Sequence, residues 1–239
     1  MIIKEIKTKM EKKNQLGFTH RFIPSKNKRT RARIRIRTSE KGSKVLTTLI
    51  LFHGTGGNED DLLPLANELD QRAAILSPRG KVLENGMPRF FRRLAEGVFD
   101  IEDLKFRTNE LADFVNDASK AYHLNLQRTI AVGYSNGANI AASMLLLRPE
   151  ILSAAILFRA MVPLVPDILP DLSNKHIFMS SGLYDPIVSK QEAERLFSLF
   201  KNAGAKASLS WQESGHELTV GEVQKAKEWL LSLHSSSIS

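Results

Sequence analysis

The sequence predicts an α/β protein built on a mostly parallel sheet with helices on both faces, and three features support that prediction. Short apolar runs alternate with longer amphipathic segments from residue 45 onward, as strands do when helices connect them in parallel. The run 45–52 is rich in apolar and β-branched residues throughout, which is typical of a strand buried on both faces. A glycine-flanked serine, Ser135, stands between a strand-like run and a helix-like run, and such a turn is at home in a sheet of this class.

The first elements along the chain are short and basic. Residues 18–23 alternate well enough to form a strand, which Pro24 stops. Residues 31–37 alternate arginine with alanine or isoleucine, so a strand there would carry four arginines on one face. That face could bind nucleic acid or an anionic membrane, or it could be the solvated side of an edge strand whose charges block pairing with another chain. We favour the edge strand, and expect no nucleic-acid partner, because no aromatic residue stands between the arginines.

From residue 45 the predicted elements follow in βα order. Strands are predicted at 45–52, 73–76, 129–132, 154–158, 177–180 and 207–211. Helices are predicted at 59–69, 104–122, 135–148, 190–201 and 219–233. Two stretches between them are expected to lack regular structure, a long segment at 81–103 and a proline-broken loop at 161–170.

The length of 239 residues suits one domain of generous size. We expect that single domain to span residues 18–234, after a basic lead-in at 1–17 and before a polar tail at 235–239. Within the domain we expect a basic insertion at 26–44 and a candidate cap loop at 81–103.

Composition excludes several classes of site. No cysteine is present, so disulfides, thiolate metal sites and a cysteine nucleophile are ruled out. The net charge of +8 is a local property, because residues 1–44 hold 15 of the 34 basic residues and only 3 of the 26 acidic ones, which leaves the rest of the chain mildly acidic. The N-terminus lacks an apolar signal segment and no apolar run is long enough to span a bilayer, so we expect a cytoplasmic protein without a transmembrane segment.

The residues 133–137 read Gly-Tyr-Ser-Asn-Gly, the G-x-S-x-G pattern of a nucleophile elbow. A serine that attacks a carbonyl must project from a sharp turn, and glycines on both sides let neighbouring backbone pass closely. The helix that follows directs its first N–H groups towards negative charge that develops beside the serine. A tight turn with a serine that only caps the helix is the alternative interpretation.

A serine nucleophile needs a base, and the base needs an orienting acid. In sheets of this class they follow the serine in the order acid, then histidine. His216 directly follows the last predicted strand, whereas His234 lies in the polar tail, so we favour His216 as the base. Asp185 follows the strand 177–180; although Asp-Pro is also a common turn, we favour it as the acid.

Asp167 and Asp171 compete for that role, but both fall in the proline-rich loop before the strand. For the oxyanion, the residue after the nucleophile supplies one backbone N–H, that of Asn136. The glycine-rich loop at 53–57 stands where esterases supply the second, which we assign to Thr55. The loop lacks the glycine spacing of nucleotide-binding motifs, and we expect His53 to be structural.

The segment 81–103 offers candidate substrate contacts. Met87, Phe90 and Phe91 could line an acyl or aryl pocket, and Arg89, Arg92 and Arg93 could meet a carboxylate or a phosphate. A loop packed on the core with solvated arginines is the alternative. A loop this long without regular structure is often functional, and both interpretations stay open.

Four stretches of the chain together resemble the phospholipase/carboxylesterase branch of the α/β-hydrolase superfamily. They are residues 51–59, the motif at 133–137, the Tyr-Asp-Pro at 184–186 and the Gly-His at 215–216. The segment 79–100 is especially similar to bacterial hydrolases induced by methylhydroquinone. The resemblance implies an α/β-hydrolase fold with an antiparallel N-terminal strand region. It also implies the same triad and oxyanion donors, no metal and no organic cofactor. The basic insertion departs from the family, in which that link is usually shorter.

We therefore expect a serine carboxylesterase that hydrolyses small to medium acyl or aryl esters through an acyl-enzyme. The alternatives are an acyl-protein thioesterase or lysophospholipase, and a catalytically silent hydrolase-like binding protein. The expected partner is a small-molecule ester, and a homodimer is compatible with the sequence.

Overall fold

The computed structural model describes residues 16–26 and 47–235; the arginine-rich run 31–37 and most of the predicted lead-in and insertion lie outside these ranges. The strands of the main sheet are β1 (His20–Ile23), β2 (Thr48–Phe52), β3 (Ala74–Pro78), β8 (Thr129–Tyr134), β9 (Ala154–Phe158), β10 (His176–Gly182) and β11 (Lys206–Gln212). Their spatial order is β1-β3-β2-β8-β9-β10-β11, and only β1 is antiparallel to its neighbour. The prediction of a mostly parallel sheet with an antiparallel N-terminal strand is confirmed.

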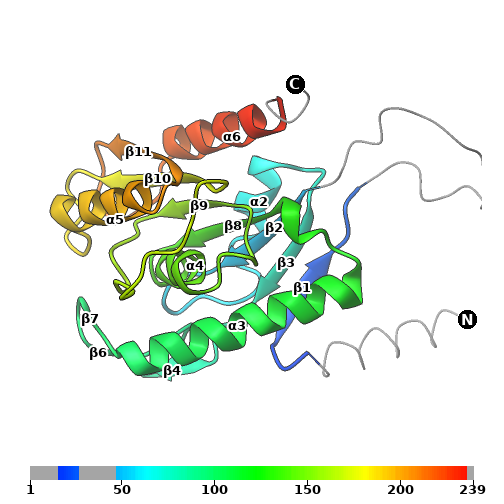
Figure 1. Cartoon of the computed structure of the whole chain (residues 1–239), viewed down its shortest axis with the longest axis horizontal. Coiled ribbons are helices and arrows are strands. Elements are labelled where there is room, and N and C mark those ends of the chain that lie inside the picture. The colour runs from blue at the N-terminus through cyan, green and yellow to red at the C-terminus, as the bar shows by residue number, and fades with distance from the viewer. Residues whose placement is uncertain (1–15, 27–46, 236–239) are drawn as a thin grey trace, which may run out of the picture.

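Helices cover both faces of this sheet (Figure 1). The helices on one face are α2 (Leu63–Leu69) and α6 (Val220–Ser235), and those on the other are α3 (Ile101–Tyr122), α4 (Asn136–Leu147) and α5 (Lys190–Asn202). A short 3-10 turn at Leu126–Arg128 leads into β8.

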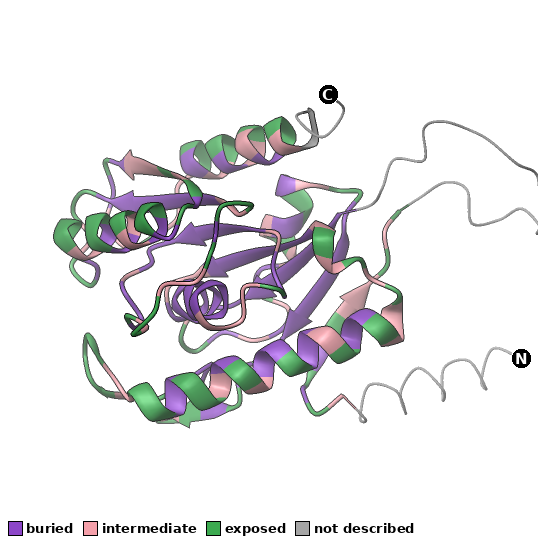
Figure 2. Ribbon diagram, viewed as in Figure 1, coloured by how far each residue is buried: buried purple, intermediate pink, exposed green. Residues whose placement is uncertain are grey.

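Strand β2 shows why the sheet needs cover on both sides. Its residues are all buried, and successive side chains point to opposite faces. Leu49 and Leu51 pack with α2 and α6, whereas Ile50 and Phe52 pack with α3 and α4. The inner strands and helix α4 therefore form the buried centre of the molecule, whereas α3, α5 and α6 each keep an exposed side outward (Figure 2).

Local signals set most helix boundaries. Helix α3 begins after Asp100, whose side chain accepts a hydrogen bond from Asp103 N, and it ends at His123 in the left-handed conformation. Helix α5 begins after Ser189 in the same way. Helix α2 begins four residues later than predicted, at Leu63, because residues 59–62 form turns and Pro64 occupies the first turn of the helix.

The segment 81–103 is not irregular, and that prediction is wrong. It folds into two small antiparallel hairpins, β4 (Val82–Glu84) with β5 (Met87–Arg89) and β6 (Arg93–Ala95) with β7 (Val98–Phe99), and α3 starts at Ile101. The first hairpin turns at Asn85 and Gly86, both with positive φ. Asn-Gly is the favoured pair for such a two-residue turn, so this hairpin had a recognisable signal in the sequence.

The residues between the two hairpins serve the core. Phe90 and Phe91 are 3% and 0% exposed and belong to the cluster beneath α3 and α4. Phe90 meets Phe52 edge-on at 5.5 Å between ring centroids, and Phe91 meets Phe99 edge-on at 5.0 Å. Two consecutive aromatic side chains in this segment therefore anchor the hairpins to the sheet.

Replacing Phe91 by alanine should lower the free energy of unfolding by about 3–5 kcal/mol, because it leaves a cavity in a closely packed core. Urea unfolding followed by circular dichroism measures the change. Leu94→Ala is the matched control, since Leu94 is 73% exposed on the next strand and its loss should cost no more than about 0.5 kcal/mol. Equal effects of the two substitutions would contradict the placement of Phe91 in the core.

Candidate active site

The carboxyl ends of the parallel strands meet at one edge of the sheet, where sites of open α/β sheets form. Ser135 follows β8, Asp185 lies just beyond β10, and His216 lies just beyond β11. The loop with Thr55 follows β2, the strand next to β8. The topology thus carries residues far apart in the sequence to one place.

The turn at Ser135 has the sharp geometry that a nucleophile elbow requires. Ser135 has φ 53° and ψ −117°, a conformation that non-glycine residues rarely adopt. A Cβ on Gly137 would stand 1.9 Å from the carbonyl oxygen of Phe52, and one on Gly133 would stand 2.6 Å from the backbone of Ala138. The two glycines are therefore needed for the close approach of backbone around the serine.

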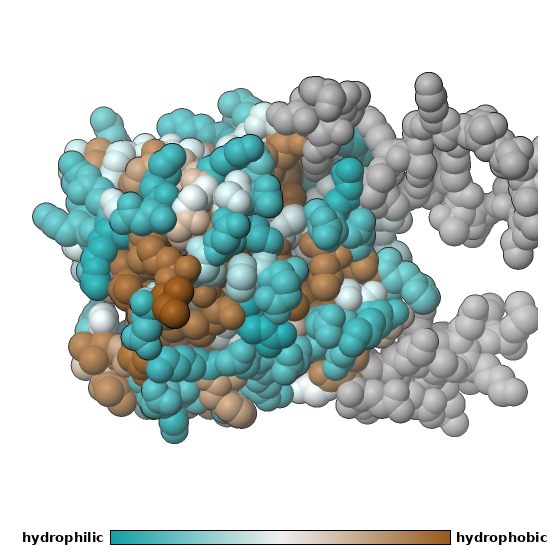
Figure 3. Space-filling model, in the orientation of Figure 1, coloured by the Kyte–Doolittle hydropathy of each residue, from teal (hydrophilic) through white to brown (hydrophobic). Residues whose placement is uncertain are grey.

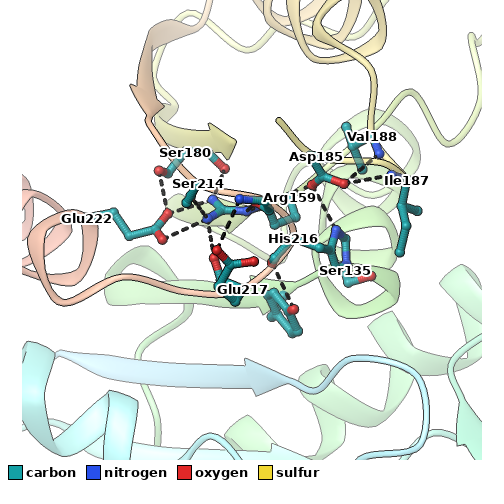
Figure 4. Close-up of polar contacts among 12 residues, drawn as sticks. Ser135, Arg159, Ser180, Asp185, Ile187, Val188, Ser214, His216, Glu217 and Glu222 are labelled. Carbon is teal, nitrogen blue, oxygen red and sulfur yellow. Dashed lines mark hydrogen bonds and ion pairs between the residues drawn. The ribbon is translucent and has the colours of Figure 1, made fainter. Parts of the chain in front are cut away.

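Three side chains form a continuous hydrogen-bonded line at this edge (Figure 4). Ser135 Oγ lies 2.9 Å from His216 Nε2, and His216 Nδ1 lies 2.8 Å from Asp185 Oδ2. The structure thus brings together the serine, histidine and aspartate that the sequence analysis singled out. The competing acids Asp167 and Asp171 are exposed in the loop before β10, and the side chain of His234 lies outside the described residues.

The partners of His216 determine which of its nitrogens carries the proton. An ionised carboxylate can only accept, so Nδ1 must donate to Asp185 and Nε2 is left to accept from the Ser135 hydroxyl. The other oxygen of Asp185 accepts hydrogen bonds from the backbone N–H groups of Ile187 and Val188, at 2.8 and 3.0 Å. The side chain of Asp185 is fully buried, and these contacts hold it in the orientation that His216 needs.

A cavity of about 370 Å³ opens beside Ser135 and His216. Thr55 and Asn136, the predicted oxyanion donors, both line it. Among the hydrogen bonds of the described residues, neither backbone N–H has a partner. The remaining walls come from the two hairpins, the end of β8, the first turn of α4 and the segments after β9 and β10. Their lining residues are Arg89, Arg93, Glu96, Gly97, Phe99, Tyr134, Asn139, Arg159, Met161, Ile187 and Val188.

The predicted substrate contacts from the segment 81–103 need correction. Phe90 and Phe91 do not line this cavity, because both side chains are consumed by core packing. Met87 is 41% exposed and lies beside Gly56 in the glycine-rich loop, but it too is outside the cavity lining. The hairpins instead contribute Arg89, Arg93 and Phe99.

Arg159, at the end of β9, is a central residue that the sequence analysis missed. Its side chain is fully buried and its φ is +58°. Two of its nitrogens bind the two carboxylate oxygens of Glu222 at 2.6 and 2.8 Å. The guanidinium also donates to the loop that carries His216, namely to Ser214 Oγ at 3.1 Å, to Gly215 O at 3.0 Å and to Glu217 O.

Glu222 connects that loop to the start of α6. Its carboxylate accepts from Thr219 N at 2.6 Å, and its own N–H donates to Thr219 Oγ1 at 3.3 Å, which is a capping box. It also accepts from Ser180 Oγ on β10 at 2.7 Å. The spacing Thr-x-x-Glu was visible in the sequence as a helix start, but nothing in it indicated a buried arginine partner.

Two further side chains, those of Tyr134 and Asn136, fix the positions of neighbouring parts of the site. Tyr134 Oη donates to the carbonyl oxygen of His216 at 3.0 Å, so the residue before the nucleophile also fixes the position of the base. Asn136 Oδ1 accepts from Phe90 N at 2.8 Å, which ties the hairpin segment to the first turn of α4. Both contacts come from the variable positions of the G-x-S-x-G motif, where the pattern alone assigns no role.

His53 is structural, as the sequence analysis expected of it. Its ring is buried at the end of β2, where Nε2 accepts from Gly80 N at 2.9 Å and Nδ1 donates to Gly54 O at 2.7 Å. Burial, the largest cause, lowers the pKa of His53 below its usual value. The neutral ring therefore links the glycine-rich loop to the segment after β3.

The described residues contain neither a group of metal ligands nor a membrane-spanning helix. Within residues 16–26 and 47–235, no three histidine, aspartate or glutamate side chains gather in a way that could hold a metal ion. No helix in those ranges is both long and apolar enough to cross a membrane.

Comparison with known proteins places this site in a known context. The phospholipase/carboxylesterase family matches residues 35–234. The Bacillus subtilis (strain 168) hydrolase MhqD is 51% identical over 190 residues, which cover 80% of this chain and 94% of that protein. The crystal structure of the Bacillus cereus carboxylesterase is 46% identical with a TM-score of 0.85, covering 93% of this chain and 98% of the other. The structure of YahD with malic acid is 31% identical with a TM-score of 0.78, covering 89% and 98%.

Glu222→Gln should lower the free energy of unfolding by on the order of 3 kcal/mol, because the buried Arg159 loses the carboxylate that binds it directly and keeps only Asp185, whose Oδ2 lies 3.9 Å from Arg159 Nε. Denaturant unfolding measures this loss. Glu228→Gln on the exposed side of the same helix is the control, with an expected change within about 0.5 kcal/mol. A Glu222→Gln protein as stable as the parent would refute the importance of the pair.

His53 should make stability depend on pH. Because its folded-state pKa is lowered, the unfolded chain binds the proton more readily between that pKa and about 6.5. The contribution of neutral His53 to the free energy of unfolding is fully present above about pH 6.5. It is lost as the pH falls through the folded-state pKa, by up to about 1.4 kcal/mol per pH unit. His53→Gln cannot titrate, so the difference in unfolding free energy between the parent and this variant should narrow from pH 8 to pH 5. If the difference in unfolding free energy between the two proteins stays constant from pH 8 to pH 5, the lowered pKa of His53 is contradicted.

Proposed function

The chain belongs to the phospholipase/carboxylesterase family, and on that premise we propose that it is a serine carboxylesterase that hydrolyses small to medium acyl or aryl esters through an acyl-enzyme. The observation that carries the proposal is the line from Ser135 Oγ to His216 Nε2 at 2.9 Å and from His216 Nδ1 to Asp185 at 2.8 Å. The proposed nucleophile, base and orienting acid are therefore already within hydrogen-bonding reach.

In the first half of the reaction, Ser135 Oγ attacks the carbonyl carbon of the ester while His216 Nε2 takes the hydroxyl proton. The carbonyl oxygen becomes an oxyanion, which the backbone N–H groups of Thr55 and Asn136 stabilise. Asn136 is the first residue of α4, so the positive end of the helix also faces the developing charge. Collapse of the intermediate breaks the bond to the alcohol oxygen, which leaves with the proton from His216.

In the second half, water replaces the alcohol. His216 takes a proton from the water while the water oxygen attacks the acyl carbon. When the bond between the acyl carbon and Ser135 Oγ breaks and the acid leaves, His216 returns that proton to Ser135 Oγ. Asp185 stabilises the imidazolium that forms in each half and keeps Nδ1 protonated. The bonds from Ile187 and Val188 to its second oxygen keep the carboxylate from turning away.

The cavity favours small esters over the substrates of an acyl-protein thioesterase or a lysophospholipase. Its volume of about 370 Å³ is near the lower end for small-molecule sites. Charged and polar side chains form much of its wall, including Arg89, Arg93 and Glu96. A long acyl chain, as a lysophospholipid or a lipidated protein would bring, gains most from a longer apolar channel. The complete hydrogen-bonded line of side chains argues against a silent binding protein.

Ser135→Ala should reduce turnover of para-nitrophenyl butyrate by at least about 10⁴-fold, because the nucleophile is lost while the fold is kept. The parent protein should also react with a fluorophosphonate probe, and the variant should not. Ser143→Ala is the matched control, since its hydroxyl is buried and donates to Asn139 O within α4. Turnover by Ser135→Ala comparable to the parent, or a parent that neither cleaves the ester nor takes the probe, would sink the proposal.

A further inference from the structure

We propose that the cavity beside Ser135 prefers esters that carry a carboxylate or another anionic group, and that Arg93 together with Arg89 forms the subsite that receives it. This inference rests on the esterase function proposed above and adds a substrate class to it. Its basis is an imbalance of charge in the cavity wall, where two guanidinium groups share a single carboxylate.

The two arginines come from neighbouring hairpins. Arg89 is the last residue of β5 and Arg93 the first of β6, and both line the cavity. Glu84, on β4, binds them both, with Oε1 2.8 Å from Arg93 Nε and Oε2 2.9 Å from Arg89 Nη1. One carboxylate neutralises one of the two positive charges, so this group carries a net charge of about +1.

Burial makes that excess charge costly. The side chain of Arg89 is 4% exposed and that of Arg93 31%. Burial lowers the pKa of Arg89, with a smaller lowering from the neighbouring Arg93 charge. A buried positive charge whose counter-charge is shared is stabilised by any further anion that reaches it. A substrate carboxylate would supply that anion and would pair with the guanidinium groups by charge-assisted hydrogen bonds.

The arginines are held in a fixed relation to the proposed nucleophile. The N–H of Phe90, next to Arg89, donates to Asn136 Oδ1 at 2.8 Å, and Gly56 N donates to Pro88 O at 2.9 Å. The strand that carries Arg89 is thus bonded both to the elbow and to the glycine-rich loop. Ser135, Arg89 and Arg93 line the same cavity of about 370 Å³, so a substrate that places its carbonyl at Ser135 enters the cavity whose wall carries both arginines.

The other charged residues of the wall do not offer the same excess. Arg159 is bound by both oxygens of Glu222 and is therefore neutralised. Glu96 lines the cavity as well, but it is exposed at the tip of the β6–β7 hairpin, where solvent screens its charge. Around that hairpin and over the loop between β9 and β10 the visible surface is largely apolar (Figure 3), with Leu94, Val98, Val165 and Ile168 exposed. The arginine pair is thus a charged spot beside an apolar rim.

The test compares pairs of anionic and neutral esters with the same reacting group. Mono-para-nitrophenyl adipate and para-nitrophenyl hexanoate place a carboxylate or a methyl group at the end of a similar acyl chain. Para-acetoxybenzoate and para-acetoxybenzamide place a carboxylate or a neutral amide on the leaving group. The ratio of kcat/KM for the anionic ester to that for the neutral one is the measured quantity, and the two pairs distinguish an anion on the acyl side from one on the alcohol side.

Arg93→Gln should lower that ratio about tenfold for at least one pair of esters, because a charge-assisted contact made by the anionic substrate is lost. The variant should fold, since Glu84 keeps Arg89 as its partner. Arg92→Gln is the matched control: Arg92 is 62% exposed, binds Asp100 and Asp103, and does not line the cavity, so the ratio should change less than twofold. A parent ratio below one, or an equal fall for both esters in Arg93→Gln, would overturn the inference.

A binding measurement separates this inference from the esterase proposal. In Ser135→Ala, which cannot turn over substrate by the proposed route, adipate should raise the Tm more than adipamide does, and the added Arg93→Gln substitution should remove that difference. If the esters are not cleaved but the adipate effect is present, the proposed function fails and the anion subsite stands. If hexanoate is cleaved but adipate shows neither preference nor binding, the subsite fails and the esterase proposal stands.

Discussion

The buried ion pair between Arg159 and Glu222 connects the elements that build the site. It joins the end of β9 to the first turn of α6, and through Ser180 and the carbonyls of residues 215 and 217 it reaches β10 and the loop that carries His216. Two charges with no exposed surface persist in a protein only when each is paired and hydrogen-bonded. The position of His216, and with it the 2.9 Å contact to Ser135, therefore depends on polar contacts behind the loop. In Figure 4 the arginine lies directly between Glu222 and this loop.

The sequence predicted the fold and the converging residues for a simple physical reason. Alternating apolar runs require a parallel sheet, and a parallel sheet brings the carboxyl ends of its strands to one edge. Residues directly after those strands, such as Ser135, Asp185 and His216, must then lie near one another even though 81 positions separate the serine from the histidine. The G-x-S-x-G motif, chain order and strand position were enough to select them, and no knowledge of side-chain packing was needed.

What the sequence did not predict depends on three-dimensional packing. The sequence left Phe90 and Phe91 open between a pocket and a loop packed on the core, and each fills a place in the core that only the folded chain defines. Arg159 follows a buried strand just as Asp185 does, but a lone arginine there gives no sign of its partner. Glu222 ends a Thr-x-x-Glu capping box, and the same residue serves as a buried counter-ion only because α6 packs on the face of the sheet beside β9 and β10.

The arginines around the cavity differ in the number of carboxylates that bind them. Arg159 makes bidentate contact with Glu222, and its other hydrogen bonds go to Ser214 Oγ and to backbone carbonyls of the loop, so it holds the loop in place. Arg89 and Arg93 share Glu84, so their charge is not cancelled and remains available to a ligand. Both arrangements bury guanidinium groups beside the same serine, and the number of carboxylates alone makes one of them structural and the other receptive. A substitution that changes that number, such as Arg93→Gln, alters what the cavity accepts, whereas one at Glu222 alters whether the site forms.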